Sequence, residues 1–136
     1  MPEDNPCAYH IRDFEVSKEM LERDNIITFE GVSSCFYLWI NGKFVGYSQV
    51  SHCTSEFNIS KFLKEGTNRF AVLVVKWCDG SYLEDQDYFR LSGIFREVYI
   101  LSRNKTRLED VFVKQSFNDD YSLCTLNIDC KLVGNA

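Results

Sequence analysis

Alternation of apolar and polar residues with a period of two constrains the fold of this chain most strongly. A period of two places every second side chain on the same face of a strand, which is typical of half-buried β-strands. The chain is therefore predicted to be all-β, with strands and turns spaced as in a sandwich or barrel. The alternation recurs in five stretches rich in β-branched and aromatic residues: Ser34–Ile40, Arg69–Trp77, Arg96–Leu101, Leu108–Val113 and Ser122–Leu132.

The dipeptide Asn41-Gly42 lies between the apolar runs Phe36–Ile40 and Lys43–Tyr47. Asn-Gly is the pair that best satisfies the two positive φ angles of a type I′ turn, so a tight β-hairpin is predicted here. Helical character is limited to two short segments, residues 16–23 and 58–64. Both are expected to connect strands, and Ser60 is predicted to cap the second.

The length and polarity of the chain indicate one domain and part of another. With 136 residues and 45% hydrophobic content, the chain can bury one core of modest size. The polar segment 102–107 is predicted to be a linker, and the sequence after it has room for about two strands. Because two strands do not form a stable domain alone, we predict a first domain over residues 1–103 and the start of a second β domain over residues 104–136.

Charge and hydropathy exclude several classes of partner. The net charge is −5 and no run of Lys or Arg is present, so a nucleic-acid partner is not expected. No stretch approaches the roughly 20 apolar residues that span a bilayer. Residues 1–5 are acidic where an export signal is basic and then apolar, so we expect a cytoplasmic protein without a membrane partner.

The six cysteines are predicted to be free and mostly buried thiols, because no export signal and no C-x-x-C spacing is present. The two histidines, His10 and His52, are isolated in the sequence. A structural zinc site is therefore not expected, and neither is a catalytic triad, since no nucleophile accompanies His52.

The densest polar cluster lies in the stretch from Trp77 to Arg96, between two predicted strands. Its four carboxylates, which define the acidic segment of residues 79–87, are Asp79, Glu84, Asp85 and Asp87. These groups could bind a hard cation or accept hydrogen bonds from sugar hydroxyls. Alternatively, they form a solvated loop whose charges pair with Arg90 and Arg96. A glycosidase pair needs carboxylates about 5 Å or about 6.5–9.5 Å apart across the scissile bond, for which acids crowded on one loop are poor candidates.

Three stretches carry a family resemblance: Phe29–Ser48, Ser55–Ser60 and Trp77–Arg96. They resemble the N-terminal sugar-binding domain of bacterial β-galactosidases in glycoside hydrolase family 2. The most specific portion runs from Asp79 through Glu84-Asp-Gln-Asp87 to the ending Gly93-Ile-Phe-Arg96. The resemblance implies a jelly-roll, galactose-binding-domain-like β-sandwich for residues 1–103, without its first strands, and the start of an immunoglobulin-like sandwich for residues 104–136.

The resemblance also implies a role for Asp87. In the parent enzyme this carboxylate would contact the galactosyl group of a β-galactoside and a sodium ion in the active site of a neighbouring barrel domain, which is chemically reasonable because a carboxylate can do both. Glu84, Asp85, Arg90 and Arg96 are expected to support the loop through ion pairs.

No catalytic residue is expected in this chain. The family's acid/base and nucleophile glutamates belong to a (β/α)₈ barrel of about 250 residues, whose strand–helix alternation is lacking here. The barrel would be a partner in cis or in trans. The chain itself is expected to hold no cofactor, whereas the parent would use sodium and magnesium and form a homo-oligomer.

Several positions depart from the family pattern, namely Val50, Thr54, Cys78 and Phe89. Phe89 replaces a tryptophan beside Asp87 and removes an indole N–H donor. Trp39 and Trp77 are predicted to pack in the core. Three functional readings remain: a β-galactosidase fragment, a free-standing carbohydrate-binding module, and an interaction subunit that completes a partner chain.

Overall fold

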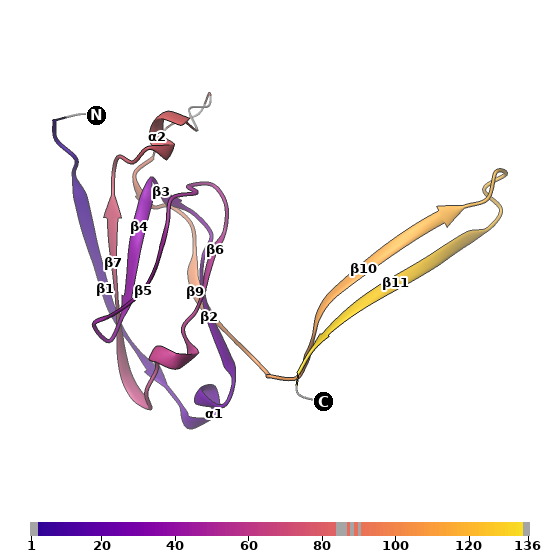
Figure 1. The fold of residues 1–136 in the computed structure, drawn as a ribbon, viewed down its shortest axis with the longest axis horizontal. Coiled ribbons are helices and arrows are strands. Elements are labelled where there is room, and N and C mark those ends of the chain that lie inside the picture. The colour runs from indigo at the N-terminus through magenta and orange to yellow at the C-terminus, as the bar shows by residue number, and fades with distance from the viewer. Residues whose placement is uncertain (1–2, 84–86, 88, 90, 135–136) are drawn as a thin grey trace. The chain divides into compact units, whose positions relative to one another are not determined.

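The computed structural model describes residues 3–83, 87, 89 and 91–134, and the chain divides into two compact units (Figure 1). Unit 1 covers Met1–Ser102 and unit 2 covers Arg103–Ala136, compared with a predicted boundary after residue 103. The described residues are mostly strands, so the all-β prediction is confirmed. Among them, no helix is long and apolar enough to cross a membrane.

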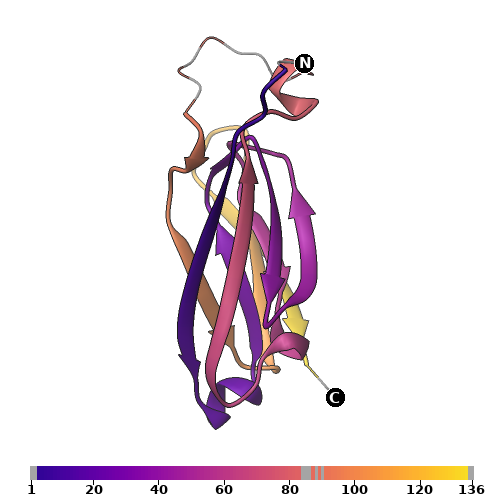
Figure 2. The same ribbon diagram turned by 90° about the vertical axis from the view of Figure 1, so that its left-hand side faces the viewer.

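Unit 1 contains a four-stranded antiparallel sheet, here called the first sheet, with strand order β1-β7-β4-β5 (Figures 1 and 2). Its strands are β1 (Cys7–Val16), β4 (Cys35–Ile40), β5 (Lys43–Ser48) and β7 (Gly66–Val75). Strand β7 is central, because it pairs with β1 along one edge and with β4 along the other. Strands β1 and β5 are the edges.

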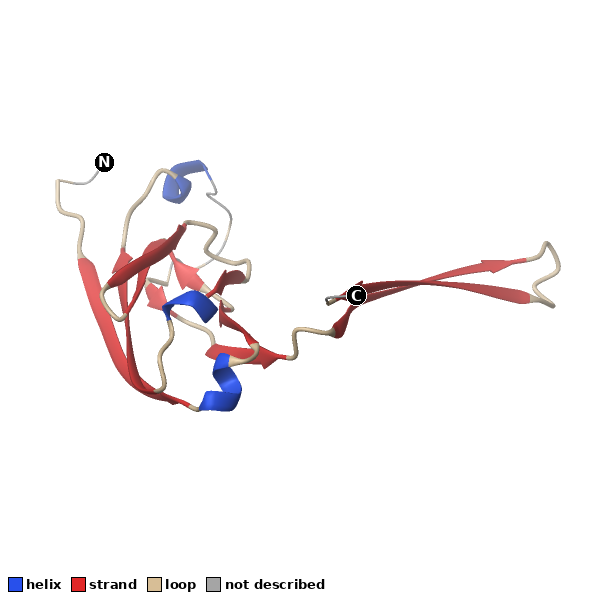
Figure 3. Cartoon of the chain, turned by 60° about the horizontal axis from the view of Figure 1, so that its bottom comes forward, coloured by secondary structure: helices blue, strands red, loops and turns tan. Residues whose placement is uncertain are grey.

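The second sheet of unit 1 has the order β6-β2-β9, from β2 (Asp24–Phe29), β6 (Ser55–Asn58) and β9 (Val98–Arg103). A short separate pair joins β3 (Val32–Ser33) to β8 (Gly93–Ile94). Three single-turn elements connect strands (Figure 3): α1 (Lys18–Leu21), η1 (Ser60–Phe62) and α2 (Gly80–Leu83).

The hydrophobic core lies between these sheets. The first sheet supplies Phe36, Leu38 and Ile40 from β4 and Val72 and Val74 from β7, all with at most 3% of their surface exposed. The second sheet supplies Ile27 and Phe29 from β2, and Ile59 completes the buried cluster together with Val32. The Phe29 and Phe36 rings lie 4.6 Å apart, so aromatic contacts join the two layers.

The predicted hairpin turn is confirmed. Asn41 and Gly42 have φ angles of 51° and 76° and lie between β4 and β5. The Asn41 side chain also donates to the Phe62 carbonyl (3.0 Å) and to Asn68 Oδ1 (2.8 Å), and it accepts from the Arg69 amide. Asn68 is 1% exposed and its amide nitrogen donates to the carbonyls of Lys64 and Gly66, so this buried group is satisfied at both ends.

Several expectations about local structure were incomplete. The segment 58–64 forms only one 3₁₀ turn, and Ile59, not Ser60, occupies its N-cap position. The Ser60 hydroxyl instead accepts from the Asn25 amide (2.8 Å), which ties this turn to β2. Strands β1, β2 and β6 were not predicted, because their residues alternate less cleanly than those of β4 and β7.

The expectation that both tryptophans pack in the core was wrong. Trp39 is half-buried on the outer face of β4, opposite the face that carries Leu38 and Ile40, and its ring stacks on Tyr37 at 6.1 Å. Trp77 is also half-buried, and the Lys76 ammonium lies 5.3 Å from its ring centroid. Successive residues of a strand project to opposite faces of the sheet. The aromatic run in β4 therefore places some of its rings in the core and others on the outer face of the first sheet.

The cysteines are free, as predicted, but the expectation that most are buried was wrong. Cys35 and Cys78 are buried, whereas Cys7, Cys53, Cys124 and Cys130 are exposed. Burial raises the pKa of the Cys35 thiol to about 11.

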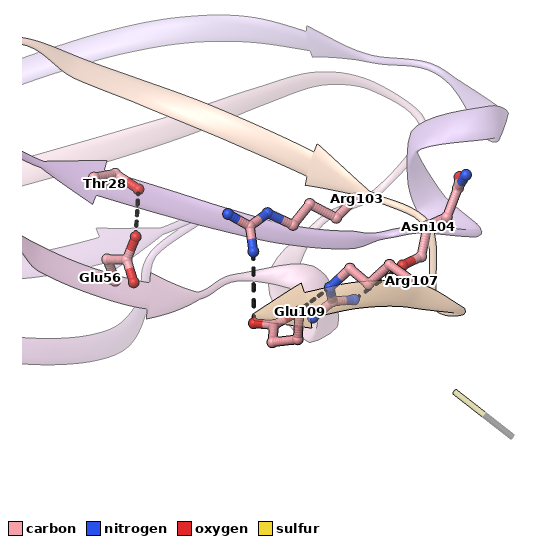
Figure 4. A network of polar contacts seen from close by, with 6 residues as sticks. All are labelled: Thr28, Glu56, Arg103, Asn104, Arg107 and Glu109. Carbon is pink, nitrogen blue, oxygen red and sulfur yellow. Dashed lines mark hydrogen bonds and ion pairs between the residues drawn. The ribbon is translucent and has the colours of Figure 1, made fainter. Parts of the chain in front are cut away.

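Unit 2 is a β-hairpin made of β10 (Arg107–Phe117) and β11 (Cys124–Val133). Its base carries an ion-pair network (Figure 4), in which Glu109 accepts from Arg107 Nε (2.5 Å) and from Arg103 (3.5 Å). The guanidinium of Arg107 holds the pKa of the Glu109 carboxyl below its usual value. Figure 4 also shows a separate contact in unit 1, where the Thr28 hydroxyl donates to Glu56 (3.4 Å).

We expect Leu38→Ala to lower the free energy of unfolding of unit 1 by about 2–5 kcal/mol, because the truncation leaves a cavity between the sheets. Lys43→Ala, at an exposed position after the turn, is the control and should change stability by less than about 0.5 kcal/mol. Urea denaturation followed by tryptophan fluorescence gives both values, since both tryptophans lie in unit 1. Equal effects of the two changes would contradict the assigned core.

We expect four thiols of the folded chain to react with Ellman's reagent within minutes at pH 8, and the remaining two only on unfolding. The thiolate is the reacting species, and burial removes both access and ionisation at Cys35. Cys35→Ser should leave the fast phase unchanged, whereas Cys7→Ser should remove one equivalent from it. Simultaneous reaction of all six thiols would contradict the burial of Cys35 and Cys78.

Candidate functional site

The candidate site is the acidic segment, which begins where β7 leaves the first sheet. Residues 76–79 lead from β7 into α2, and Asp79 Oδ1 accepts from the Gly80 amide (3.0 Å) at the start of that turn. Asp87 is exposed. Three of the predicted loop-supporting residues, Glu84, Asp85 and Arg90, lie outside the described residues, so their role stays a prediction.

Asn5 holds the chain at the point where it leaves the sheet. Its side-chain amide donates to the Trp77 carbonyl (3.0 Å), and its Oδ1 accepts from the Trp77 amide (3.0 Å). The Lys76 amide donates to the Pro6 carbonyl (3.0 Å), which extends the pairing of β1 and β7 by one more bond. The side chain thus replaces the next backbone pair of the ladder.

Ser34 holds the same exit from the other side. Its hydroxyl donates to the Lys76 carbonyl (2.8 Å) and accepts from the Ser81 hydroxyl (2.9 Å). The Ser81 hydroxyl accepts from the Cys78 amide (3.1 Å), and the Ser34 carbonyl accepts from Ser51 (3.2 Å). One serine therefore links β4, the end of β7, α2 and the loop after β5.

Beside this network lies a cluster of weak acids, formed by the buried thiols of Cys35 and Cys78 and by the partly exposed Tyr47. Burial is the main reason that the pKa of Cys35 rises, and burial and the hydrogen bond to Cys35 raise the pKa of the Tyr47 hydroxyl well above its usual value. The Cys35 thiol and the Tyr47 hydroxyl therefore stay neutral at pH 7, and the cluster supplies packing and weak hydrogen bonds.

Arg96, the other predicted supporting residue, is exposed and lies with its guanidinium 5.6 Å from the Phe95 ring centroid. The ring of His52 lies 5.3 Å from the same Phe95. Arg96 thus stacks on the neighbouring Phe95 ring. Its predicted pairing with Glu84 or Asp85 involves residues that are not described.

Among the described residues, the site offers the exposed carboxylate of Asp87. This carboxylate lies on a segment whose starting point is held by hydrogen bonds. Within the described ranges, no group of three or more His, Cys, Asp or Glu side chains gathers to hold a metal ion. A cation bound at Asp87 would therefore need further oxygen ligands from elsewhere.

Sequence reasoning missed Asn5 and Ser34, the two residues whose side chains hold the start of the acidic segment in place. Both are small polar residues one or two positions before a strand, where alternation carries no information. Their role depends on the register of β1, β4 and β7, which opposes Cys7 and Cys35 to the same residue, Val75. Only that register places Asn5 and Ser34 on either side of residues 76 and 77.

Comparison with known proteins identifies the family. The sequence profile described as "Glycosyl hydrolases family 2, sugar binding domain" matches residues 1–104. Curated β-galactosidases are similar over nearly the whole chain: that of Staphylococcus xylosus is 47% identical over 99% of the chain, and that of Pseudoalteromonas haloplanktis is 48% identical over 94%. The chain spans only 14% and 12% of the length of these relatives.

Solved structures show the same fold at low identity. A β-glucuronidase of Ruminococcus gnavus matches with a TM-score of 0.79 at 14% identity, over 93% of this chain and 24% of its own. A β-glycosidase of Bacteroides vulgatus matches with a TM-score of 0.77 at 23% identity, over 96% of this chain and 16% of its own. By its sequence, this chain belongs to glycosyl hydrolase family 2, as a sugar-binding N-terminal domain of the β-galactosidase-like members.

Proposed function

We propose that this chain supplies Asp87 to the galactose subsite of a β-galactosidase whose catalytic barrel lies outside these 136 residues. The observation that supports the proposal most directly is the exposed Asp87 carboxylate on a segment whose base is held by Asn5 and Ser34. The curated relatives at 42–48% identity are β-galactosidases, which favours a terminal β-galactoside as the substrate. The chain itself has no catalytic role in this proposal.

The physical role of Asp87 is to accept hydrogen bonds. A carboxylate accepts from sugar hydroxyls through two oxygens and can share one oxygen with a sodium ion. Because the carboxylate is exposed in unit 1, it is available to a second wall that brings the remaining ligands. We further propose that sodium binds at this shared position, that magnesium acts elsewhere in the parent enzyme, and that this enzyme is a cytoplasmic homo-oligomer.

Complementation tests this proposal. The chain is mixed with the Staphylococcus xylosus β-galactosidase from which the matching residues have been deleted, and hydrolysis of a chromogenic β-galactoside is measured. We expect recovery of activity with the unaltered chain and none with the chain alone. Asp87→Asn, which keeps size but removes charge, should lower kcat/KM of the mixture by about 10²-fold, as expected for lost charged hydrogen bonds.

Two controls separate the parts of this proposal. Asp119→Asn removes an exposed carboxylate in the hairpin loop and should leave recovery unchanged. Recovery with normal kcat/KM in Asp87→Asn would contradict the role of Asp87 but keep the role of the domain. Failure of the unaltered chain to restore activity would contradict the domain's role as well.

A second candidate function is favoured by the outer face of the first sheet. Tyr37, Trp39, Phe44 and Tyr47 form a cluster of partly exposed rings there, with Trp39 and Phe44 at 5.7 Å and Tyr37 and Tyr47 at 4.7 Å. Aromatic faces stack on sugars, so a free-standing carbohydrate-binding module would use this cluster. Calorimetric binding of lactose by the isolated chain, lost in Trp39→Ala and retained in Asp87→Asn, would favour this candidate.

The Ser34 network generates a further prediction. Ser34→Ala removes the bond to the Lys76 carbonyl and leaves the Ser81 hydroxyl with only the weaker acceptor Cys78 Sγ (3.9 Å), at a cost of about 1–2 kcal/mol. In the complementation assay we expect the concentration of chain needed for half-maximal recovery to rise by about 5–30-fold. Ser122→Ala, in the hairpin loop, is the matched control.

Hydrogen exchange distinguishes positioning from a general loss of stability. The Cys78 amide donates to Ser81 and should exchange faster in Ser34→Ala, while the amide of the core residue Val72 keeps its rate. Equal acceleration at both amides would show a global effect and contradict a positioning role.

A further inference from the structure

The Asn41-Gly42 turn holds the one Asn-Gly dipeptide of the chain. Asn-Gly is the dipeptide most prone to spontaneous deamidation, because glycine has no Cβ to shield its amide nitrogen from the asparagine side chain. The Gly42 nitrogen bonds to Asn41 Cγ, the Cγ–Nδ2 bond breaks, and ammonia leaves with the proton of the Gly42 amide. Water then opens the cyclic imide and leaves aspartate or isoaspartate at position 41.

In the folded chain every polar atom of the Asn41 side chain is engaged. Nδ2 uses both of its hydrogens, toward the Phe62 carbonyl (3.0 Å) and Asn68 Oδ1 (2.8 Å), and Oδ1 accepts from the Arg69 amide (3.0 Å). Attack requires the reacting atoms to lie about 3–3.5 Å apart with their orbitals aligned. The three hydrogen bonds oppose both the turning of the side chain toward Gly42 and the departure of its nitrogen.

Asn68, the partner of Asn41, cannot adapt to a changed side chain. It is 1% exposed, its amide nitrogen donates to the carbonyls of Lys64 and Gly66 (2.7 and 2.8 Å), and its Oδ1 also accepts from the Lys64 amide (2.9 Å). A half-turn of this amide group would place its oxygen against two carbonyls and its nitrogen against an N–H donor. Asn68 therefore offers only an acceptor to position 41.

The product of deamidation does not fit this network. An ionised carboxylate has no hydrogen to donate, so at position 41 it would lie oxygen to oxygen with Asn68 Oδ1 and with the Phe62 carbonyl. Two hydrogen bonds would be lost, one of them to a buried side chain. In isoaspartate the backbone also gains a methylene group, which changes the geometry of the two-residue turn. Either product weakens the link between the β4–β5 turn and the start of β7.

We propose that Asn41-Gly42 is a modification site whose access is controlled by folding. The site is closed in the folded chain and opens when the β4–β5 turn or the whole of unit 1 unfolds, so the rate of deamidation follows the fraction of open molecules. Reaction in the open form then prevents the turn from regaining its full set of hydrogen bonds. Time spent unfolded is thereby converted into a permanent loss of stability of unit 1. The proposal is independent of the role of Asp87.

Peptide mass mapping of the 136-residue chain, incubated at mildly alkaline pH with and without guanidinium chloride, tests the control by folding. Lys105→Gly supplies an internal reference, because it creates a second Asn-Gly dipeptide at the exposed Asn104. We expect deamidation at Asn41 to be at least about tenfold slower than at Asn104 in buffer, and the two rates to agree within about threefold in denaturant. A ratio of the two rates that denaturant leaves unchanged would overturn the proposal.

The Asn41→Asp variant tests the consequence of the reaction, since it reproduces one product. We expect the urea midpoint of unit 1, followed by tryptophan fluorescence, to fall by about 1 M, or the variant to be unfolded without urea. Asn58→Asp makes the same change at an exposed position in unit 1, keeps the oxygen that accepts from the Ser60 amide, and should leave the midpoint unchanged. A normal midpoint in Asn41→Asp would show that the product is harmless and would also overturn the proposal.

Discussion

The pairing of β7 with two neighbouring strands, each in a defined register, is the constraint on which the rest of unit 1 depends. Its ten residues pair with β1 along one edge and its second half with β4 along the other, and both neighbours begin opposite Val75. Since the pairing fixes which residues share a face, it buries Val72 and Val74 against the second sheet and leaves Leu73 on the outer layer. The same pairing places Asn5 and Ser34 beside the chain just as it leaves the sheet.

The candidate site follows from this arrangement. A segment that leaves a sheet normally gains freedom at once, because its backbone groups lose their ladder partners. Here side chains from both flanking strands bind the carbonyls and amides of residues 76–78 directly or through Ser81. The acidic segment therefore starts from a defined position, while Asp87 keeps its carboxylate in solvent. A fixed origin combined with an available carboxylate is what the role proposed for Asp87 requires.

Much of the fold could be predicted from the sequence, and the reasons differ between elements. The Asn41-Gly42 turn was predictable because its backbone angles demand those residue types, and β4 and β7 because their alternation is strong. Strand β1 was missed because it is an edge strand whose residues are largely exposed, so it lacks a clean apolar face. The side of β4 that carries Trp39 was mistaken, since alternation gives two faces but does not say which faces the core when both are aromatic. The acidic cluster that contains Asp87 was visible in the sequence, but its predicted substrate role came only from the family resemblance and stays a prediction. Asn5 and Ser34 could not be found, because their contacts span 42 to 72 positions.

The strands of the two units pair residues at very different separations along the chain, and this difference affects how fast each unit forms. Joining Val16 to Gly66 brings together residues 50 positions apart, and the far end of the same pair joins Cys7 to Val75. In unit 2, Phe117 meets Cys124 across one short loop. Closing long loops carries an entropy cost before contacts compensate it, so sheets with distant partners form slowly, whereas hairpins form in roughly 1–10 μs. When the 136-residue chain refolds from denaturant, the hairpin is thus the fast element and the sandwich the slow one, because β1 and β7 must first meet across 50 or more positions.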